Sequence, residues 1–196
     1  MTVTINGSGT VTGVSVGGLP DGIVDTDMIA ANAVTEAKTT VPGIIMTDAY
    51  KVTSNFSGTS YITSNWARDT TRGGGNKGSA MSESSGVFTF PSTGIYLVHF
   101  QARGSINNVN NREVIIQIFF TSDNSNYEET ANAAFNQYDS NSTTHDSCNT
   151  QKILDITDVS NQKVKFRVQT NESAFATYGD SSISFTFAQF TRLGDT

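Results

Sequence analysis

The fold of this chain is decided by the stretch from Ser84 to Ala102, which reads SSGVFTFPSTGIYLVHFQA. Phe88 and Phe90 alternate with polar neighbours before the Pro-Ser-Thr-Gly sequence, which predicts a strand that ends in a turn. After the turn, apolar or aromatic side chains recur at every second position: Tyr96, Val98, Phe100 and Ala102. Because successive side chains of a strand point to opposite faces, this spacing predicts a second strand with one buried face.

The chain from Ile44 onward repeats this pattern in short runs separated by Gly, Asn and Ser. The predicted strands are Ile44–Thr53, Ser60–Arg68, Val87–Phe90, Ile95–Arg103, Val114–Thr121, Glu128–Asn136, Gln151–Ile156, Lys163–Thr170 and Ile183–Thr191. Helical patterns are nearly absent after Lys38, and charged residues make up only 15% of the chain. Such a composition suits strands and polar turns better than helices. The sequence therefore predicts an all-β sandwich or jelly roll.

The centre of this region resembles C1q/TNF-type jelly-roll domains, in which a Phe-x-x-Pro-x-x-Gly-x-Tyr core recurs. The matching residues are Phe88, Pro91, Gly94, Tyr96 and, further on, Phe100. The resemblance implies a C1q/TNF-like jelly-roll head over residues 46–196, a homotrimer, and a binding role rather than an enzymatic one. The chain lacks the cysteines, collagen stalk and signal peptide of animal C1q domains, which argues against a secreted complement or lectin protein.

Two strands are apolar on both faces. Val114–Thr121 carries Ile115 and Phe119 opposite its main apolar set, and Ile95 and Leu97 lie opposite Tyr96 and Val98. A sandwich strand of this kind requires that its outer face be covered. We predict that a threefold neighbour covers it, with a trimer interface formed by Ile95, Leu97, Ile115 and Phe119. The alternative is cover by a loop or by the N-terminal arm of the same chain.

Residues 1–45 differ from the rest and predict an extended arm with one short helix. Small Val- and Ile-containing runs lie among Gly and Ser, and DTDMIAANAVTEAK (Asp25–Lys38) predicts a helix at about 26–38 with an acidic N-terminal cap. Alone, this arm cannot bury enough apolar surface to offset the entropy of ordering it. We therefore expect it to braid with copies of itself or to lie on another protein. The alternative is a disordered tail.

The arm also resembles the N-terminal segments of virion fibre proteins from tailed phages, especially marine and cyanobacterial ones. The matching stretch is VSVGGLPDGIVDTDMIAANAVT, residues 14–35. The resemblance implies a virion protein made in the cytoplasm of a host bacterium, whose arm docks on other virion proteins and whose head binds a glycan or protein of the host surface. The alternative function is a purely structural virion component, such as a capsid decoration, collar or tail-joint protein. The predicted attachment residues are Val3, Ile5, Val11, Val14, Val16, Ile23, Met28 and Ile29.

Bulk properties exclude several classes of function. The net charge of −6 argues against a nucleic-acid surface, which needs clustered Lys and Arg. No apolar run approaches the roughly 20 residues of a membrane helix, so we expect no membrane insertion. The N-terminal MTVTINGSGT lacks the basic and apolar regions of a secretory signal. Cys148 is the only cysteine, so no internal disulfide is possible, and we expect maturation in a reducing compartment.

No motif predicts catalysis, a metal or a cofactor. The glycine-rich Arg68–Ser79 lacks the phosphate-loop pattern and predicts an exposed connection, free to contact an anion. His145 and Cys148 form a single His-x-x-Cys pair, too few ligands for structural zinc, and predict an exposed turn. Receptor-binding residues cannot be assigned from the sequence. The loops that suit surface recognition, with Tyr among Asn, Ser and Asp, are Ser122–Glu129, Asn136–Ser147 and Asn171–Ser182.

Overall fold

The computed structural model describes residues 4–5, 11–12, 43–107, 111–137 and 142–196. The chain divides into two compact units, Met1–Gly43 and Ile44–Thr196. In the first unit, strands β1 (Thr4–Ile5) and β2 (Val11–Thr12) pair antiparallel, with Ile5 in register with Val11. The predicted helix at 26–38 and the other predicted attachment residues lie outside the described residues.

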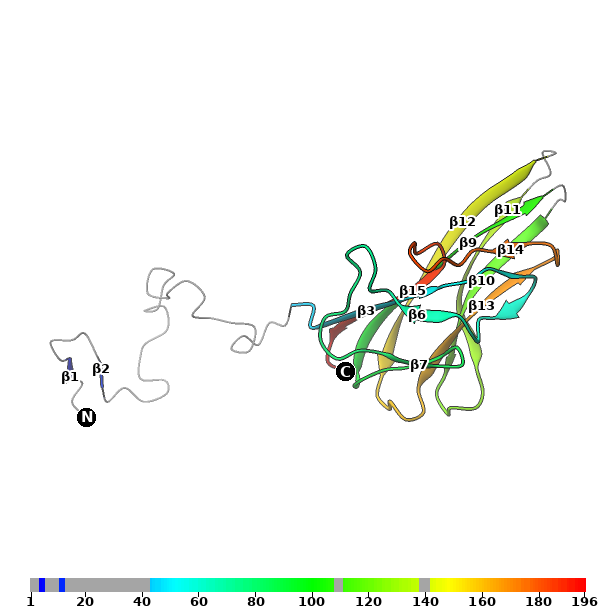
Figure 1. Ribbon diagram of the computed structural model, residues 1–196. Coiled ribbons are helices and arrows are strands. Elements are labelled where there is room, and N and C mark those ends of the chain that lie inside the picture. The colour runs from blue at the N-terminus through cyan, green and yellow to red at the C-terminus, as the bar shows by residue number, and fades with distance from the viewer. Residues whose placement is uncertain (1–3, 6–10, 13–42, 108–110, 138–141) are drawn as a thin grey trace. The chain divides into compact units, whose positions relative to one another are not determined.

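The second unit consists of two antiparallel sheets, and no helix occurs in its described part. The six-stranded sheet has the order β11-β10-β13-β8-β7, with β5 also paired to β13. Its strands are β5 (Ser60–Tyr61), β7 (Ser82–Ser84), β8 (Val87–Thr89), β10 (Asn111–Thr121), β11 (Glu128–Gln137) and β13 (Lys163–Thr170). Figure 1 shows the long strands of both sheets running together toward one end of the unit.

The seven-stranded sheet has the order β4-β14-β9-β15-β3-β6, with β12 also paired to β9. Its strands are β3 (Met46–Val52), β4 (Phe56–Ser57), β6 (Trp66–Arg68), β9 (Gly94–Asn107), β12 (Thr143–Ile156), β14 (Ala176–Thr177) and β15 (Phe187–Gly194). Strand β9 lies in the middle of this sheet, hydrogen-bonded to β12 and β15 along most of its length. The second half of the opening stretch is therefore a central strand.

The core lies between the two sheets and is rich in aromatic rings. The ring of Phe166 on β13 lies with its centroid 4.7 Å from that of Phe100 on β9 and 5.4 Å from that of Phe88 on β8. Phe88 in turn lies 5.2 Å from Phe190 on β15. These rings come from both sheets and are fully buried. The predicted inward set of β9 is confirmed, because the period-two pattern places Tyr96, Val98, Phe100 and Ala102 in this core.

The turn between β8 and β9 explains the Pro-Ser-Thr-Gly sequence. The hydroxyl of the buried Tyr96 donates a hydrogen bond back to the carbonyl of Ser92 at 3.0 Å, and its ring packs on Phe90 with centroids 4.7 Å apart. Gly94 has a φ of 145°, and a Cβ at this position would lie 2.4 Å from Nε of Arg192. Only glycine fits there, so the motif residues are required by the turn itself.

Several predicted elements differ from the structure. The predicted strand Ser60–Arg68 is two strands, β5 and β6, which belong to different sheets. His145 and Cys148, predicted in an exposed turn, lie inside β12, which begins at Thr143. The last strand begins at Phe187 and not at Ile183, and the short β7 was not predicted. Thr, Ser and Asn dominate the start of β12, so local propensity favours a loop there, and the 14 consecutive partners in β9 override it.

The hairpin between β7 and β8 makes a specific prediction about Gly86. Ser85 and Gly86 both have positive φ, 52° and 79°, as a two-residue type I′ turn requires. A Cβ at Gly86 would lie 2.1 Å from the carbonyl oxygen of Ile62. We expect Gly86→Ala to lower the free energy of unfolding by about 1–3 kcal/mol, measured by urea denaturation. Ser85→Gly is the matched control and should leave stability unchanged or raise it; a similar loss in both variants would contradict this explanation.

Candidate functional site

The outer face of the seven-stranded sheet carries a contiguous apolar patch. Ile95 and Leu97 alternate with the buried Tyr96 and Val98, so they point outward from β9. Leu97 is in register with Ile153 on β12, whose side chain is 59% exposed. On the other side of β9, Phe187 of β15 lies near His99, with ring centroids 5.6 Å apart. We call these five residues the outer patch: Ile95, Leu97, His99, Ile153 and Phe187.

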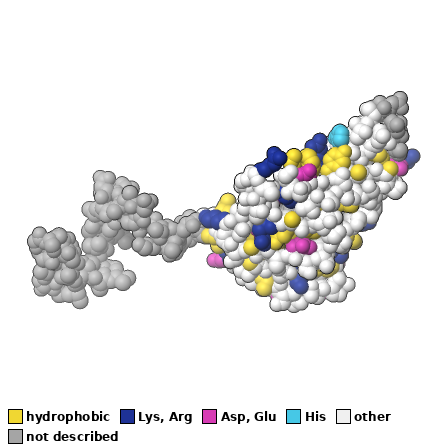
Figure 2. Space-filling model, viewed as in Figure 1, with side chains coloured by type: hydrophobic (Ala, Val, Ile, Leu, Met, Phe, Trp, Pro, Cys, Tyr) yellow, Lys and Arg dark blue, Asp and Glu magenta, His cyan; other side chains and the backbone are white. Residues whose placement is uncertain are grey.

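The position of the outer patch distinguishes it from ordinary scattered apolar residues. Its members come from three adjacent strands, and the central strand β9 contributes most of them. Isolated exposed apolar side chains are normal, whereas a contiguous group indicates a contact surface. Figure 2 shows hydrophobic side chains at several places on one face of the molecule, within a surface that is mostly of other types. The sheet therefore presents apolar surface at its middle and not only at its edges.

The predicted trimer interface is split between the two sheets. Ile95 and Leu97 lie on the outer face of the seven-stranded sheet, whereas Ile115 and Phe119 on β10 point outward from the six-stranded sheet. A single flat contact with one neighbour cannot include both pairs. Phe119 is only 8% exposed within its own chain, because the ring of Tyr61 on β5 packs against its ring, with the two ring centroids 5.1 Å apart. Phe119 is therefore covered by a residue of its own chain, which is the alternative considered from the sequence.

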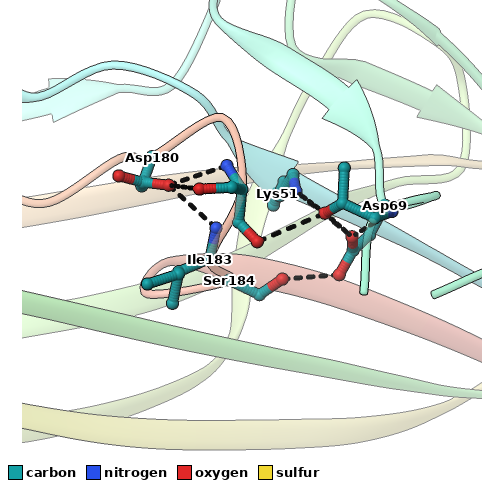
Figure 3. Close-up of polar contacts among 7 residues, drawn as sticks. Lys51, Asp69, Asp180, Ile183 and Ser184 are labelled. Atoms are coloured by element: carbon teal, nitrogen blue, oxygen red, sulfur yellow. Dashed lines mark hydrogen bonds and ion pairs between the residues drawn. The ribbon is translucent and has the colours of Figure 1, made fainter. Parts of the chain in front are cut away.

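A buried ion pair lies at the edge of the outer patch. Lys51 on β3 is in register with Phe187, yet only 2% of its side chain is exposed. Its Nζ lies 3.3 Å from Oδ1 of Asp69 and donates a hydrogen bond to the hydroxyl of Thr71. Asp69 also accepts a hydrogen bond from the hydroxyl of Ser184 (Figure 3). The pair thus ties β3 to two connecting segments that cover it.

Hydrogen bonds to the carboxylates of Asp69 and Asp180 lower the pKa of both groups. Burial acts to raise the pKa of Asp69, but hydrogen bonds from Ser184, Thr71 and Lys51 outweigh it and hold the pKa below the ordinary value of 3.8. Asp180 accepts backbone N–H groups of Ser182 and Ile183 at 2.7 and 2.8 Å, which lowers its pKa (Figure 3). Both carboxylates are therefore structural anions that fasten the loop before β15 over Lys51.

Arg68, predicted in a loop free to contact an anion, is engaged inside the protein. Its Nε lies 3.0 Å from the buried Asp48, and its Nη2 donates to the hydroxyl of Tyr50 at 2.6 Å and to the carbonyl of Met81 at 2.7 Å. Since Asp48 also accepts the backbone N–H of Met81, the guanidinium joins β3 and β6 to the chain ahead of β7. The prediction that Arg68 is free to contact an anion was wrong. Its carboxylate partner, Asp48, lies 20 residues earlier in the sequence on another strand, so the local sequence does not reveal the pair.

Comparison with known proteins identifies the fold. No family model matches the sequence, and no curated protein matches it. Among solved structures, murine APRIL at pH 5.0 superposes with a TM-score of 0.54 at 13% identity, over 76% of this chain and 98% of that one. Eiger TNF from S. frugiperda superposes with a TM-score of 0.56 at 13% identity, over 79% of this chain and 96% of that one. The fold is a C1q/TNF-like jelly roll. The resemblance predicted from the Phe88-to-Phe100 motif is confirmed at the level of fold.

The jelly roll places the His-x-x-Cys pair, His145 and Cys148, on opposite faces of β12. His145 points outward from β12, where its Nδ1 lies 3.2 Å from the hydroxyl of Tyr178, while Cys148 points toward the core. Burial raises the pKa of the Cys148 thiol to about 12. Within 43–107, 111–137 and 142–196, no group of three or more His, Cys, Asp or Glu side chains could hold a metal ion.

The described part of the chain also contains no helix long and apolar enough to cross a membrane.

The three loops predicted for surface recognition have different outcomes. Ser122–Tyr127 is the connection between β10 and β11, as predicted. Much of Asn136–Ser147 belongs instead to β11 and β12. In Asn171–Ser182, the Tyr178 hydroxyl is hydrogen-bonded to Ser105 at 2.6 Å. Ile153 and Phe187 were not predicted as site residues, although alternation within their strands already places them opposite buried neighbours.

We expect His99 to make the stability of the jelly roll depend on pH. Burial lowers the pKa of His99 below the ordinary value of 6.5, against a smaller opposing effect of its hydrogen bond to the side chain of Asn149. As the pH falls below about 6.5, the unfolded chain binds the proton first, so stability is lost with decreasing pH. We expect the wild type to lose more stability than His99→Gln between about pH 7.5 and about pH 5.5 in urea denaturation. His145→Gln is the matched control; equal losses in the wild type and His99→Gln would contradict the prediction.

Proposed function

We propose that this chain is a virion fibre protein of a tailed phage, in which three copies of the jelly roll form a head. The arm of residues 1–45 attaches the fibre to other virion proteins, and the head binds the host surface. The resemblance of residues 14–35 to phage fibre segments supports the virion part of the proposal. The C1q/TNF-like fold supports the trimeric head.

The outer patch carries the assembly part of this proposal. Ile153 is more than half exposed in the single chain, beside Leu97 on the central strand of the sheet. Covering this surface with a second copy removes apolar area from water at about 25 cal/mol per Å². The proposed interface keeps Ile95 and Leu97 and adds Ile153 and Phe187. No role in catalysis is proposed, because assembly and surface binding account for the features described.

Light scattering on the whole chain tests the assembly, with an expected mass of three times 21.0 kDa. Pre-incubation of host cells with the purified protein tests the function, and we expect it to block adsorption of the phage particle. A label on Thr196, which follows β15 and lies near the start of the head at Met46, should mark the head at the distal part of a fibre in images of the particle. If the protein does not block adsorption and particles without it lose integrity, the alternative of a structural virion component replaces this proposal.

A further inference from the structure

The outer face of the six-stranded sheet carries a cationic strip. Strand β13 alternates so that Val164, Phe166 and Val168 are fully buried, and Lys163, Lys165 and Arg167 point outward. Three of the chain's 12 Lys and Arg thus lie on one strand face of a protein with net charge −6. Among the residues that the structure describes, neither Lys165 nor Arg167 has a carboxylate within ion-pair distance.

Two tyrosines hold Lys165 in place. Its Nζ lies 4.2 Å from the ring centroid of Tyr61 on β5 and 4.0 Å from that of Tyr127, which precedes β11. The guanidinium of Arg167 lies 5.5 Å from the Tyr61 ring. Such contacts attract and order a cation but do not neutralise it. Burial lowers the pKa of Lys165, so its charge is partly desolvated without a counter-ion.

Gln117 provides a second, independent feature of this face. It is only 4% exposed and is in register with Arg167 on one side and with Asn132 of β11 on the other. Its Nε2 donates to Glu129, but its Oε1 has no hydrogen-bond partner in the described structure. A buried acceptor without a donor costs about 1–3 kcal/mol, so a ligand whose hydroxyl reaches Oε1 after a movement of the Gln117 side chain would recover part of this free energy.

We propose that this face, centred on Lys165, Arg167 and Gln117, binds an acidic polysaccharide. Carboxylate or sulfate groups of the sugar chain pair with Lys165 and Arg167, and a sugar hydroxyl donates to Oε1 of Gln117 after a rotation of that side chain exposes the buried oxygen. Glu129 accepts hydrogen bonds from the side-chain amides of Gln117 and Asn132 and places a negative charge on this face. That charge and the negative net charge of the chain disfavour a densely charged polyphosphate as the ligand. The proposal deepens the host-binding role proposed above, on which it rests, by naming the ligand class.

Affinity electrophoresis of the whole chain tests this proposal, with alginate for carboxylates, dextran sulfate for sulfates, and neutral dextran as the uncharged polymer. We expect retardation by one or both acidic polymers and none by dextran. Lys165→Gln/Arg167→Gln should weaken binding about tenfold or more, since a hydrogen bond to a charged group contributes about 1.5–3 kcal/mol. The matched control Arg72→Gln/Lys152→Gln removes two exposed cations elsewhere and should change affinity less than about twofold.

Further measurements separate the possible failures. Lys165→Arg/Arg167→Lys keeps both charges and should retain binding, and thermal unfolding checks that every variant is folded. Equal losses in the two double Gln variants, or equally tight binding of single-stranded DNA, would overturn the proposal in favour of unspecific polyanion binding. If the protein blocks phage adsorption but no acidic polymer retards it, the ligand class is wrong and the host-binding function stands. If neither occurs, both proposals fail.

Discussion

Leu97→Asp is expected to convert the assembled protein into monomers of 21.0 kDa while the jelly roll stays folded. Leu97 lies at the centre of the outer patch, between Ile153 on β12 and Thr191 on β15. The substitution removes about 1.5–3 kcal/mol of apolar burial from each copy, and the interface must then also desolvate a carboxylate. In the monomer, the new side chain points into solvent, opposite the fully buried Tyr96 and Val98, so the core is unchanged.

Light scattering and thermal unfolding of the same samples provide the measurement. Ala134→Asp is the control, because it also introduces a carboxylate on an outer face, at an exposed residue of β11 in the other sheet. It should remain assembled. A Leu97→Asp protein that keeps the mass of the wild type would show that the outer patch is not the interface. Phe119→Asp is unsuitable for this purpose, because Phe119 packs beneath Tyr61 and its replacement disturbs the fold.

Asp69→Ala is expected to lower the free energy of unfolding by about 3–5 kcal/mol. The substitution leaves the ammonium of Lys51 98% buried with no carboxylate at 3.3 Å, and it also removes the acceptor of the Ser184 hydroxyl. Since Asp69 is 18% exposed, water partly replaces it, and the loss should lie toward the lower end of this range. The loop before β15 should lose protection against hydrogen exchange, because Asp69 holds Ser184 in that loop.

The double variant Lys51→Met/Asp69→Leu separates the cost of an unpaired charge from the value of the pair. Replacing a buried ion pair by apolar side chains is often neutral, whereas removing one partner is not. We therefore expect the double variant to be more stable than Asp69→Ala in urea denaturation. If the double variant is as unstable as Asp69→Ala, the hydrogen bonds of the pair with Thr71 and Ser184 contribute more to stability than the attraction between its charges.

The two sheets of this jelly roll have outer faces of different chemistry. The seven-stranded sheet exposes Leu97 and Ile153, which suit another copy of the chain, whereas the six-stranded sheet exposes Lys165 and Arg167. One face can therefore assemble the head while the other remains open to a ligand. The proposed assembly and the proposed polysaccharide site do not compete for the same surface.

The sequence by itself determined most of the long strands and the inward side of β9. In β9, strict alternation identified Tyr96, Val98 and Phe100 as core residues, because strand periodicity is a property of neighbours along the chain. The Phe88-to-Phe100 motif also predicted the C1q/TNF-like fold, since the β8–β9 turn needs Gly94 and Tyr96 within a few residues of each other.

Only the tertiary structure decided what covers each outer face. It paired Leu97 with Ile153, placed Tyr61 over Phe119, buried Lys51 against Asp69, and enclosed Lys165 between two tyrosines. Each of these contacts joins residues on different elements, and local alternation states only that a side chain points outward. Its partner depends on strand order and on the path of the loops, which result from the packing of the whole domain.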